Sequence, residues 1–102
     1  MKSIMQNVKY CYVCGETHNL HKHHVMKGTR NRDKAEKDGL WVYLCYDHHE
    51  GTYGVHGKLG HDLDMYLIKE AENRWINYYN KSTEEFIERY GRNYLWVIMK
   101  SY

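Results

Sequence analysis

Two short metal-ligand pairs constrain this chain more than any other feature. The first pair is Cys11-Tyr12-Val13-Cys14 and the second is Cys45-Tyr46-Asp47-His48. Thiolates and an imidazole at this spacing are the donors that tetrahedral Zn²⁺ prefers. Three cysteines cannot all pair as disulfides, and a C-x-x-C spacing is more typical of metal sites in a cytosolic protein. The sequence therefore predicts a structural zinc site that closes a hairpin.

The fourth zinc ligand has two candidates, His48 and His49, because both spacings after Cys45 are tolerated, and His48 is preferred. A bound zinc ion contributes on the order of 10 kcal/mol to folding. That contribution matters in a chain of 102 residues, of which 42% are hydrophobic. The alternative is that the three cysteines are small buried hydrophobic residues that bind no metal.

The remaining pattern predicts an α+β fold in one domain. Strands are expected at residues 8–13, 21–26 and 40–44, and a polar loop with at most one helical turn at residues 29–38. The glycines at 51, 54, 57 and 60 favour a loop that carries His56, because glycine destabilises a helix interior. The zinc and catalytic core then covers about residues 8–60.

A helical packing region is expected at residues 61–102. Apolar residues at helical spacing predict an amphipathic helix at residues 62–79, and this spacing places its tyrosines and tryptophan in the core. Ser82-Thr83-Glu84-Glu85 has the form of a capping box, so a second helix should follow and end at Gly91. Residues 94–99 form a strand or a docking segment.

Basic residues gather locally although the formal net charge is only +2. Between residues 22 and 37, six cations face two acidic residues, Asp33 and Glu36; the cations are Lys22, Lys27, Arg30, Arg32, Lys34 and Lys37. A charge run is usually a solvated face, but this run lies beside the histidine-rich segment. Arg30 and Arg32 are therefore candidate phosphate contacts.

All eight histidines lie between residues 18 and 61. Once zinc has taken its ligands, the chain retains more histidines beside the basic run than structural needs require; these are His23, His24, His49 and His56. His18 and His21 are expected to be surface or strand-face residues. His61 is expected to be a polar residue near the start of the long helix.

These residues resemble the HNH (ββα-metal) endonuclease family, and in particular small HNH proteins of bacteriophages and prophages. The resemblance covers roughly residues 11–75. It rests on a histidine doublet nested between two zinc half-sites, in the order Cys11-x-x-Cys14, His23-His24-Val25, Gly39-Leu40-x-Val42-x-Leu44-Cys45, His48-His49 and Val55-His56-Gly57. The combination carries the signal, because a histidine doublet alone is common.

The resemblance implies a fold, an activity and residue roles. His24 matches the general base and His23 matches a catalytic metal ligand, with His49 and His56 both candidates for the partner ligand. It implies a ββα-metal core that cuts double-stranded DNA, as an endonuclease or a nickase, and leaves 5′-phosphate and 3′-hydroxyl ends. The catalytic ion would be Mg²⁺, Mn²⁺, Ni²⁺ or Zn²⁺. The family's middle asparagine has no counterpart in residues 38–42, so the orienting role is unassigned.

Other functions fit the same cysteines. A noncatalytic zinc ribbon that binds DNA, or an adaptor in phage packaging that assists a terminase, needs the zinc ligands but has no use for His24. A toxin of the colicin type shares the catalytic motif. No apolar run long enough for a membrane span is present, and a cytoplasmic protein of the bacterial host cell is expected. A homodimer would use the aromatic residues Trp75, Tyr78, Tyr79, Trp96 and Tyr102.

Overall fold

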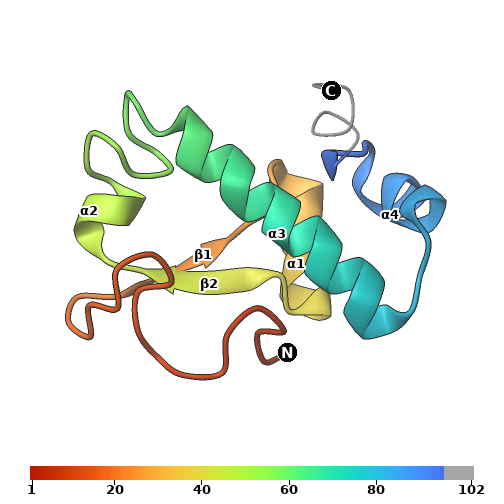
Figure 1. The fold of residues 1–102 in the computed structure, drawn as a ribbon, viewed down its shortest axis with the longest axis horizontal. Coiled ribbons are helices and arrows are strands. Elements are labelled where there is room, and N and C mark those ends of the chain that lie inside the picture. Colours follow the sequence, from red (N-terminus) through yellow and green to blue (C-terminus); the bar gives the residue numbers. More distant parts are fainter. Residues whose placement is uncertain (96–102) are drawn as a thin grey trace.

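A two-stranded antiparallel hairpin lies at the centre of the fold (Figure 1). The computed structural model describes residues 1–95. Their elements are β1 (His21–His24), α1 (Thr29–Asp38), β2 (Trp41–Leu44), α2 (Tyr46–His49), α3 (His61–Tyr79) and α4 (Thr83–Tyr90). The described residues therefore form a small α+β fold with one two-stranded sheet and four helices, as the sequence predicts for its class.

The register of the hairpin determines which side chains share a face. His21 lies opposite Leu44 and His24 lies opposite Trp41, and the Val25 N–H donates to the Leu40 carbonyl just beyond the ladder. Successive residues of a strand point to opposite faces of the sheet. His21 and His23 therefore share one face of β1, and His24 lies on the other.

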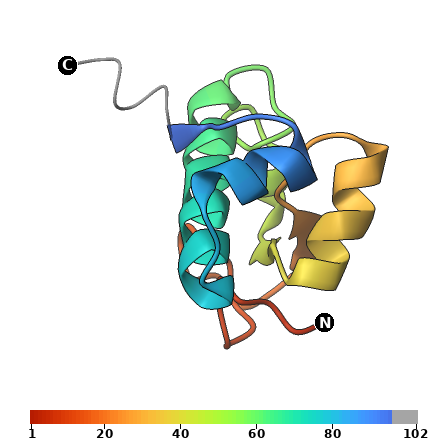
Figure 2. The same ribbon diagram turned by 90° about the vertical axis from the view of Figure 1, so that its right-hand side faces the viewer.

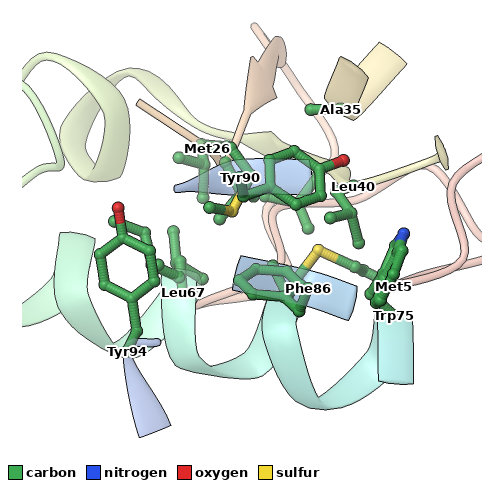
Figure 3. Packing of buried hydrophobic residues seen from close by; sticks show 14 of the residues in the cluster. Met5, Met26, Ala35, Leu40, Leu67, Trp75, Phe86, Tyr90 and Tyr94 are labelled. Atoms are coloured by element: carbon green, nitrogen blue, oxygen red, sulfur yellow. The ribbon is translucent and has the colours of Figure 1, made fainter. Parts of the chain in front are cut away.

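Helices cover the hairpin on both sides, with α3 and α1 flanking the strands (Figure 2). The main core lies between α3, α4 and residues 40–44, which include the strand β2 (Figure 3). Its largest fully buried side chains include Phe86, Leu40, Leu44, Leu67 and Ile68. Trp75 of α3 makes edge-on contact with the Phe86 ring, with centroids 5.5 Å apart. Helix α4 is thereby anchored to the C-terminal part of α3.

Residues 29–38 form a ten-residue helix, and the expectation of a loop there is wrong. The segment has no apolar stripe, because only Ala35 and Asp38 are buried. Tertiary contacts stabilise it instead. Asn31 donates to the Tyr90 carbonyl and Lys34 donates to the Arg89 carbonyl, so α1 caps the C-terminal end of α4.

Residues 8–13 do not form a strand, although their composition favours one. The chain turns here: the Cys11 N–H donates to the Glu16 carbonyl, and the Gly15 N–H donates to the Cys11 carbonyl. This segment contacts β2 only through isolated hydrogen bonds, such as the one from the Tyr12 N–H to the Tyr43 carbonyl. The turn at residues 11–15 therefore prevails over the β propensity of Val8 and Val13, both of which are exposed.

Helix α3 agrees with its predicted range, but part of its predicted core face is wrong. Leu67, Ala71 and Trp75 are buried as expected, whereas Tyr66 and Tyr78 are 54% and 60% exposed. The buried stripe runs through Asp64 and Glu72, two polar positions that apolar periodicity does not identify.

The capping box of α4 is confirmed. Ser82 accepts from the Glu85 N–H while the Glu85 side chain accepts from the Ser82 N–H, and Gly91 ends the helix in the left-handed conformation. Among the described residues, no helix is both long and apolar enough to cross a membrane. The predicted segment 94–99 lies largely outside the described residues, as do Trp96 and Tyr102.

Candidate metal centres

The cysteine cluster consists of Cys11, Cys14, Cys45 and His48, whose ligand atoms all lie within 4.8 Å of one another. The Cys14 and Cys45 sulfurs are 3.8 Å apart, and His48 Nδ1 lies 3.7 Å from Cys11 Sγ and 3.2 Å from Cys45 Sγ. A tetrahedral zinc ion has S–S edges of roughly 3.8 Å and S–N edges of roughly 3.5 Å. The four donors are therefore spaced as around one ion, and they can bind a metal such as zinc.

Short local structures bring the two ligand pairs together. Cys11 and Cys14 lie on the turn of residues 11–15 before β1, and Cys45 follows β2 as the N-cap of α2. Helix α2 is a single turn, so His48 falls three positions after Cys45 on the same side of the helix. This turn selects His48 as the fourth member of the cluster, and His49 faces elsewhere.

The chemical state of Cys11 suits a metal ligand. Burial raises the pKa of its thiol, but hydrogen bonds from the backbone N–H groups of Cys45, Cys14 and Val13 outweigh burial and lower the pKa to about 6. Burial raises the pKa of Cys45. A thiolate is the form that binds metal, so Cys11 is a ready metal ligand at neutral pH.

The histidine cluster consists of His23, His49 and His56, whose ligand atoms also lie within 4.8 Å of one another. Ring centroids are 5.3 Å apart for His23 and His49, 5.4 Å for His23 and His56, and 4.7 Å for His49 and His56. Each histidine comes from a different element: β1, α2 and the loop before α3. Both candidates for the partner ligand thus lie beside His23.

The glycine-rich loop of residues 51–60 positions His56. Its backbone runs against α2, with bonds from the Val55 N–H to the His48 carbonyl and from the His56 N–H to the His49 carbonyl. A Cβ on Gly57 would collide with the Gly51 carbonyl oxygen. Because only glycine permits this close approach, the regular glycine spacing folds the loop back and brings His56 to His49.

One nitrogen in the histidine cluster stands out. His23 is 7% exposed, and its buried Nε2 has no hydrogen-bond partner among the described residues. Burial, with smaller contributions from His49 and His56, lowers the pKa of His23 to about 3. Burial also lowers the pKa of His49. Neutral imidazoles with a free nitrogen are the form that binds a metal, and an unpartnered buried nitrogen is otherwise unfavourable.

His49 is held by its neighbours. Its Nδ1 lies 2.9 Å from His21 Nδ1 and 3.3 Å from a Glu50 carboxylate oxygen, which leaves Nε2 available. Metal-binding histidines generally use the second ring nitrogen for such an orienting contact. Strand alternation already places His21 on the face of His23, and the structure adds its contact with His49.

A pocket of about 580 Å³ opens beside the histidine cluster. His24 lines it together with His23, His49 and His56, and the other polar residues at its wall are Lys22, Lys27, Arg32 and Asp64. His24 Nε2 lies 2.7 Å from a Glu36 carboxylate oxygen. Hydrogen bonds from Lys22 and then His24 lower the pKa of Glu36 to about 2, so this carboxylate is ionised.

The basic run divides into structural and pocket-facing residues. Lys34 caps α4, and Lys22 and Lys27 pair with Glu36 and Asp64 at 2.7 Å. Arg32 lines the pocket, whereas Arg30 is exposed and is not part of the pocket lining. Of the two arginines expected to hold phosphates, one therefore lies at the pocket, and Lys27 lies there as well.

Comparison with known proteins leaves the family open: no protein-family profile, no curated protein and no solved structure matches this chain.

Sequence reasoning missed Glu36, Lys27 and Asp64 as neighbours of the site. Glu36 carries no local signal, because its place opposite His24 depends on a helix that the composition of residues 29–38 does not indicate.

Proposed function

We propose that this protein is a metal-dependent DNA endonuclease of the HNH (ββα-metal) type, in which the cysteine cluster holds structural zinc. The observation that carries the proposal is the histidine cluster. Three imidazoles from separate elements converge, and one of them carries a buried nitrogen without a hydrogen-bond partner. They line a pocket together with a fourth histidine and several cations. Packing alone gives no reason for this arrangement, since it leaves a buried polar atom without a partner.

The donor set favours particular ions. Three imidazoles without a carboxylate suit Zn²⁺ or Ni²⁺ better than Mg²⁺, which prefers oxygen ligands. Bound there by His23, His49 and His56, the ion would supply Lewis-acid stabilisation of the negative charge that develops on the phosphate and on the leaving oxygen.

His24 is the general base in this proposal. Glu36 engages its Nε2, so Nδ1 is the ring nitrogen that remains to act as a base, and His24 lines the pocket. Nδ1 accepts a proton from the attacking water as the new P–O bond forms and the bond to the 3′ oxygen breaks, and the 3′ oxygen leaves protonated by solvent. General-base catalysis of this kind contributes typically 10²–10⁴-fold to a rate, stated as an order of magnitude.

The cations of the pocket bind the backbone of the substrate. Lys27 and Arg32 line the same pocket as His24, and Arg32 has no ion-pair partner in the described part of the chain. Such contacts position double-stranded DNA without reading its sequence. We therefore expect binding that weakens steeply with salt and has little base preference.

The test is cleavage of supercoiled plasmid by zinc-loaded protein with Ni²⁺, Zn²⁺, Mn²⁺ or Mg²⁺ added, comparing the natural sequence with His24→Ala. The expected result is metal-dependent nicking that falls by at least about 100-fold in His24→Ala. His18→Ala is the matched control, because His18 is exposed and lies outside the pocket lining. Zinc content must be equal in all three proteins.

A folded, zinc-loaded protein that cuts no DNA with any of these ions contradicts the proposal. If such a protein still binds DNA, a noncatalytic zinc-ribbon role, as a DNA-binding protein or a packaging adaptor, takes its place. Cleavage that His24→Ala leaves unchanged removes His24 from the mechanism.

A further inference from the structure

Glu36 of α1 contacts His24 through the ring nitrogen Nε2. The distance between His24 Nε2 and Glu36 Oε1 is 2.7 Å, which is short for a hydrogen bond between a ring N–H and a carboxylate. His24 lines the pocket and Glu36 does not. His24 therefore connects the carboxylate to the lining of the pocket.

This contact fixes which ring nitrogen carries the proton. An ionised carboxylate only accepts hydrogen bonds, so the shared proton must belong to His24 Nε2. In the neutral imidazole, Nδ1 is then the unprotonated nitrogen. The opposite tautomer would place the lone pair of Nε2 against the carboxylate and the proton on Nδ1, which could then not accept another.

The carboxylate is itself held in place. Lys22 Nζ lies 2.7 Å from the same Glu36 oxygen, and the amino group of Met1 lies 3.5 Å from the other. Lys22 also lies over the Trp41 ring, 4.1 Å from its centroid. Since Lys22 and His24 share one face of β1, the helix α1 presents Glu36 to both at once.

We propose that Glu36 is a positioning residue that holds His24 as the Nε2–H tautomer with Nδ1 toward the pocket. The inference rests on the proposed function for its catalytic meaning, but the contact with His24 can be tested separately. Glu36 does not touch the reacting atoms and acts through the ring of His24.

The first arm of the test needs no enzymatic activity. Histidine is labelled with ¹⁵N, and the ring resonances of His24 are assigned by their loss in His24→Ala. At about pH 8 an ordinary imidazole is neutral, and a single fixed tautomer then gives two widely separated ring ¹⁵N shifts. We expect these shifts in the natural protein, and we expect them to converge in Glu36→Ala as the tautomers interchange.

The second arm is kinetic. Glu36→Ala should lower kcat for plasmid nicking by roughly 10- to 100-fold with KM changed less than about threefold, because orientation of the base matters in the transition state. Glu36→Gln should recover part of the loss, since an amide oxygen still accepts from Nε2–H. In a His24→Ala background, Glu36→Ala should have no further effect.

The matched control is Glu88→Ala, which makes the same change of charge on the exposed side of α4. It should leave the His24 shifts and the kinetics unchanged. If Glu36→Ala does not fold, Glu36→Leu supplies both measurements, because leucine also removes the acceptor and favours the helix.

Unchanged ¹⁵N shifts in Glu36→Ala overturn the inference, and so does a further loss of rate in the His24→Ala background. If the natural protein nicks no DNA but Glu36 still fixes the tautomer of His24, the proposed function fails while the positioning contact stands. The two failures are therefore distinguishable.

Discussion

Asp38 joins three helices through one buried carboxylate, and replacing it with alanine should destabilise the protein strongly. Asp38 ends α1, and its side chain is 12% exposed. It accepts hydrogen bonds from Trp75 Nε1 at 2.8 Å and from the Tyr90 hydroxyl at 2.7 Å, and it pairs with the Arg89 guanidinium. In Asp38→Ala all of these donors lose their acceptor.

The magnitude follows from which donors stay buried. Trp75 and Tyr90 are 5% and 4% exposed, and each unsatisfied buried donor costs about 1–3 kcal/mol. The Arg89 side chain is 34% exposed, so solvent can compensate much of its loss. We therefore expect Asp38→Ala to lower the free energy of unfolding by about 3–5 kcal/mol, which corresponds to roughly 15–30 °C in Tm.

The assay is urea unfolding followed by tryptophan fluorescence, with zinc kept saturating. Arg89→Met is the matched control, because it removes the ion pair but leaves the bonds from Trp75 and Tyr90 intact; it should cost only about 1–2 kcal/mol. The reasoning is refuted if Asp38→Ala costs less than about 1 kcal/mol, or if Arg89→Met costs as much as Asp38→Ala.

Three further changes have expected outcomes. Removing zinc with a strong chelator, or replacing Cys45 with serine, should abolish cooperative unfolding observed by circular dichroism, because structural zinc contributes on the order of 10 kcal/mol; an unchanged Tm would argue against a metal in the cysteine cluster. Glu72→Gln should raise Tm at about pH 8, and the gain should shrink toward about pH 5. The sign follows because Glu72 is fully buried and burial raises its pKa, so its contribution to stability is present at low pH and is lost as the pH rises through the folded-state pKa; a gain that grows on acidification would reverse this sign. Ser82→Ala should cost about 1 kcal/mol in urea unfolding through loss of the capping box, and a neutral result would mean that tertiary contacts such as those of Phe86 and Tyr90 suffice to hold α4.

The sequence predicts elements well where a local rule decides them. The Ser82 box and Gly91 bound α4, and the glycine spacing predicts the loop that carries His56. Prediction from the sequence fails where contacts between distant residues determine the local structure. Helix α1 has no apolar face, and its stability comes from contacts of Asn31, Lys34 and Asp38 with distant residues, which no window of sequence contains.

The candidate site divides in the same way. Spacing predicts the cysteine cluster, because one turn of α2 fixes the relation between Cys45 and His48. The same spacing leaves His49 and His56 as alternatives, whereas the fold brings both to His23. The sequence does not predict the contact of Glu36 with His24, because this contact joins α1 to β1.

Titration of a second metal ion into protein that already carries one zinc ion per chain tests most directly whether the histidine cluster is catalytic. Nicking of supercoiled plasmid is followed as Ni²⁺ or Zn²⁺ is added. We predict no cleavage with the first ion alone and saturating activation as one further ion binds per chain, with His23→Ala failing to activate. Full cleavage with a single zinc ion, or none after the second ion has bound, would contradict a catalytic role for the histidine cluster.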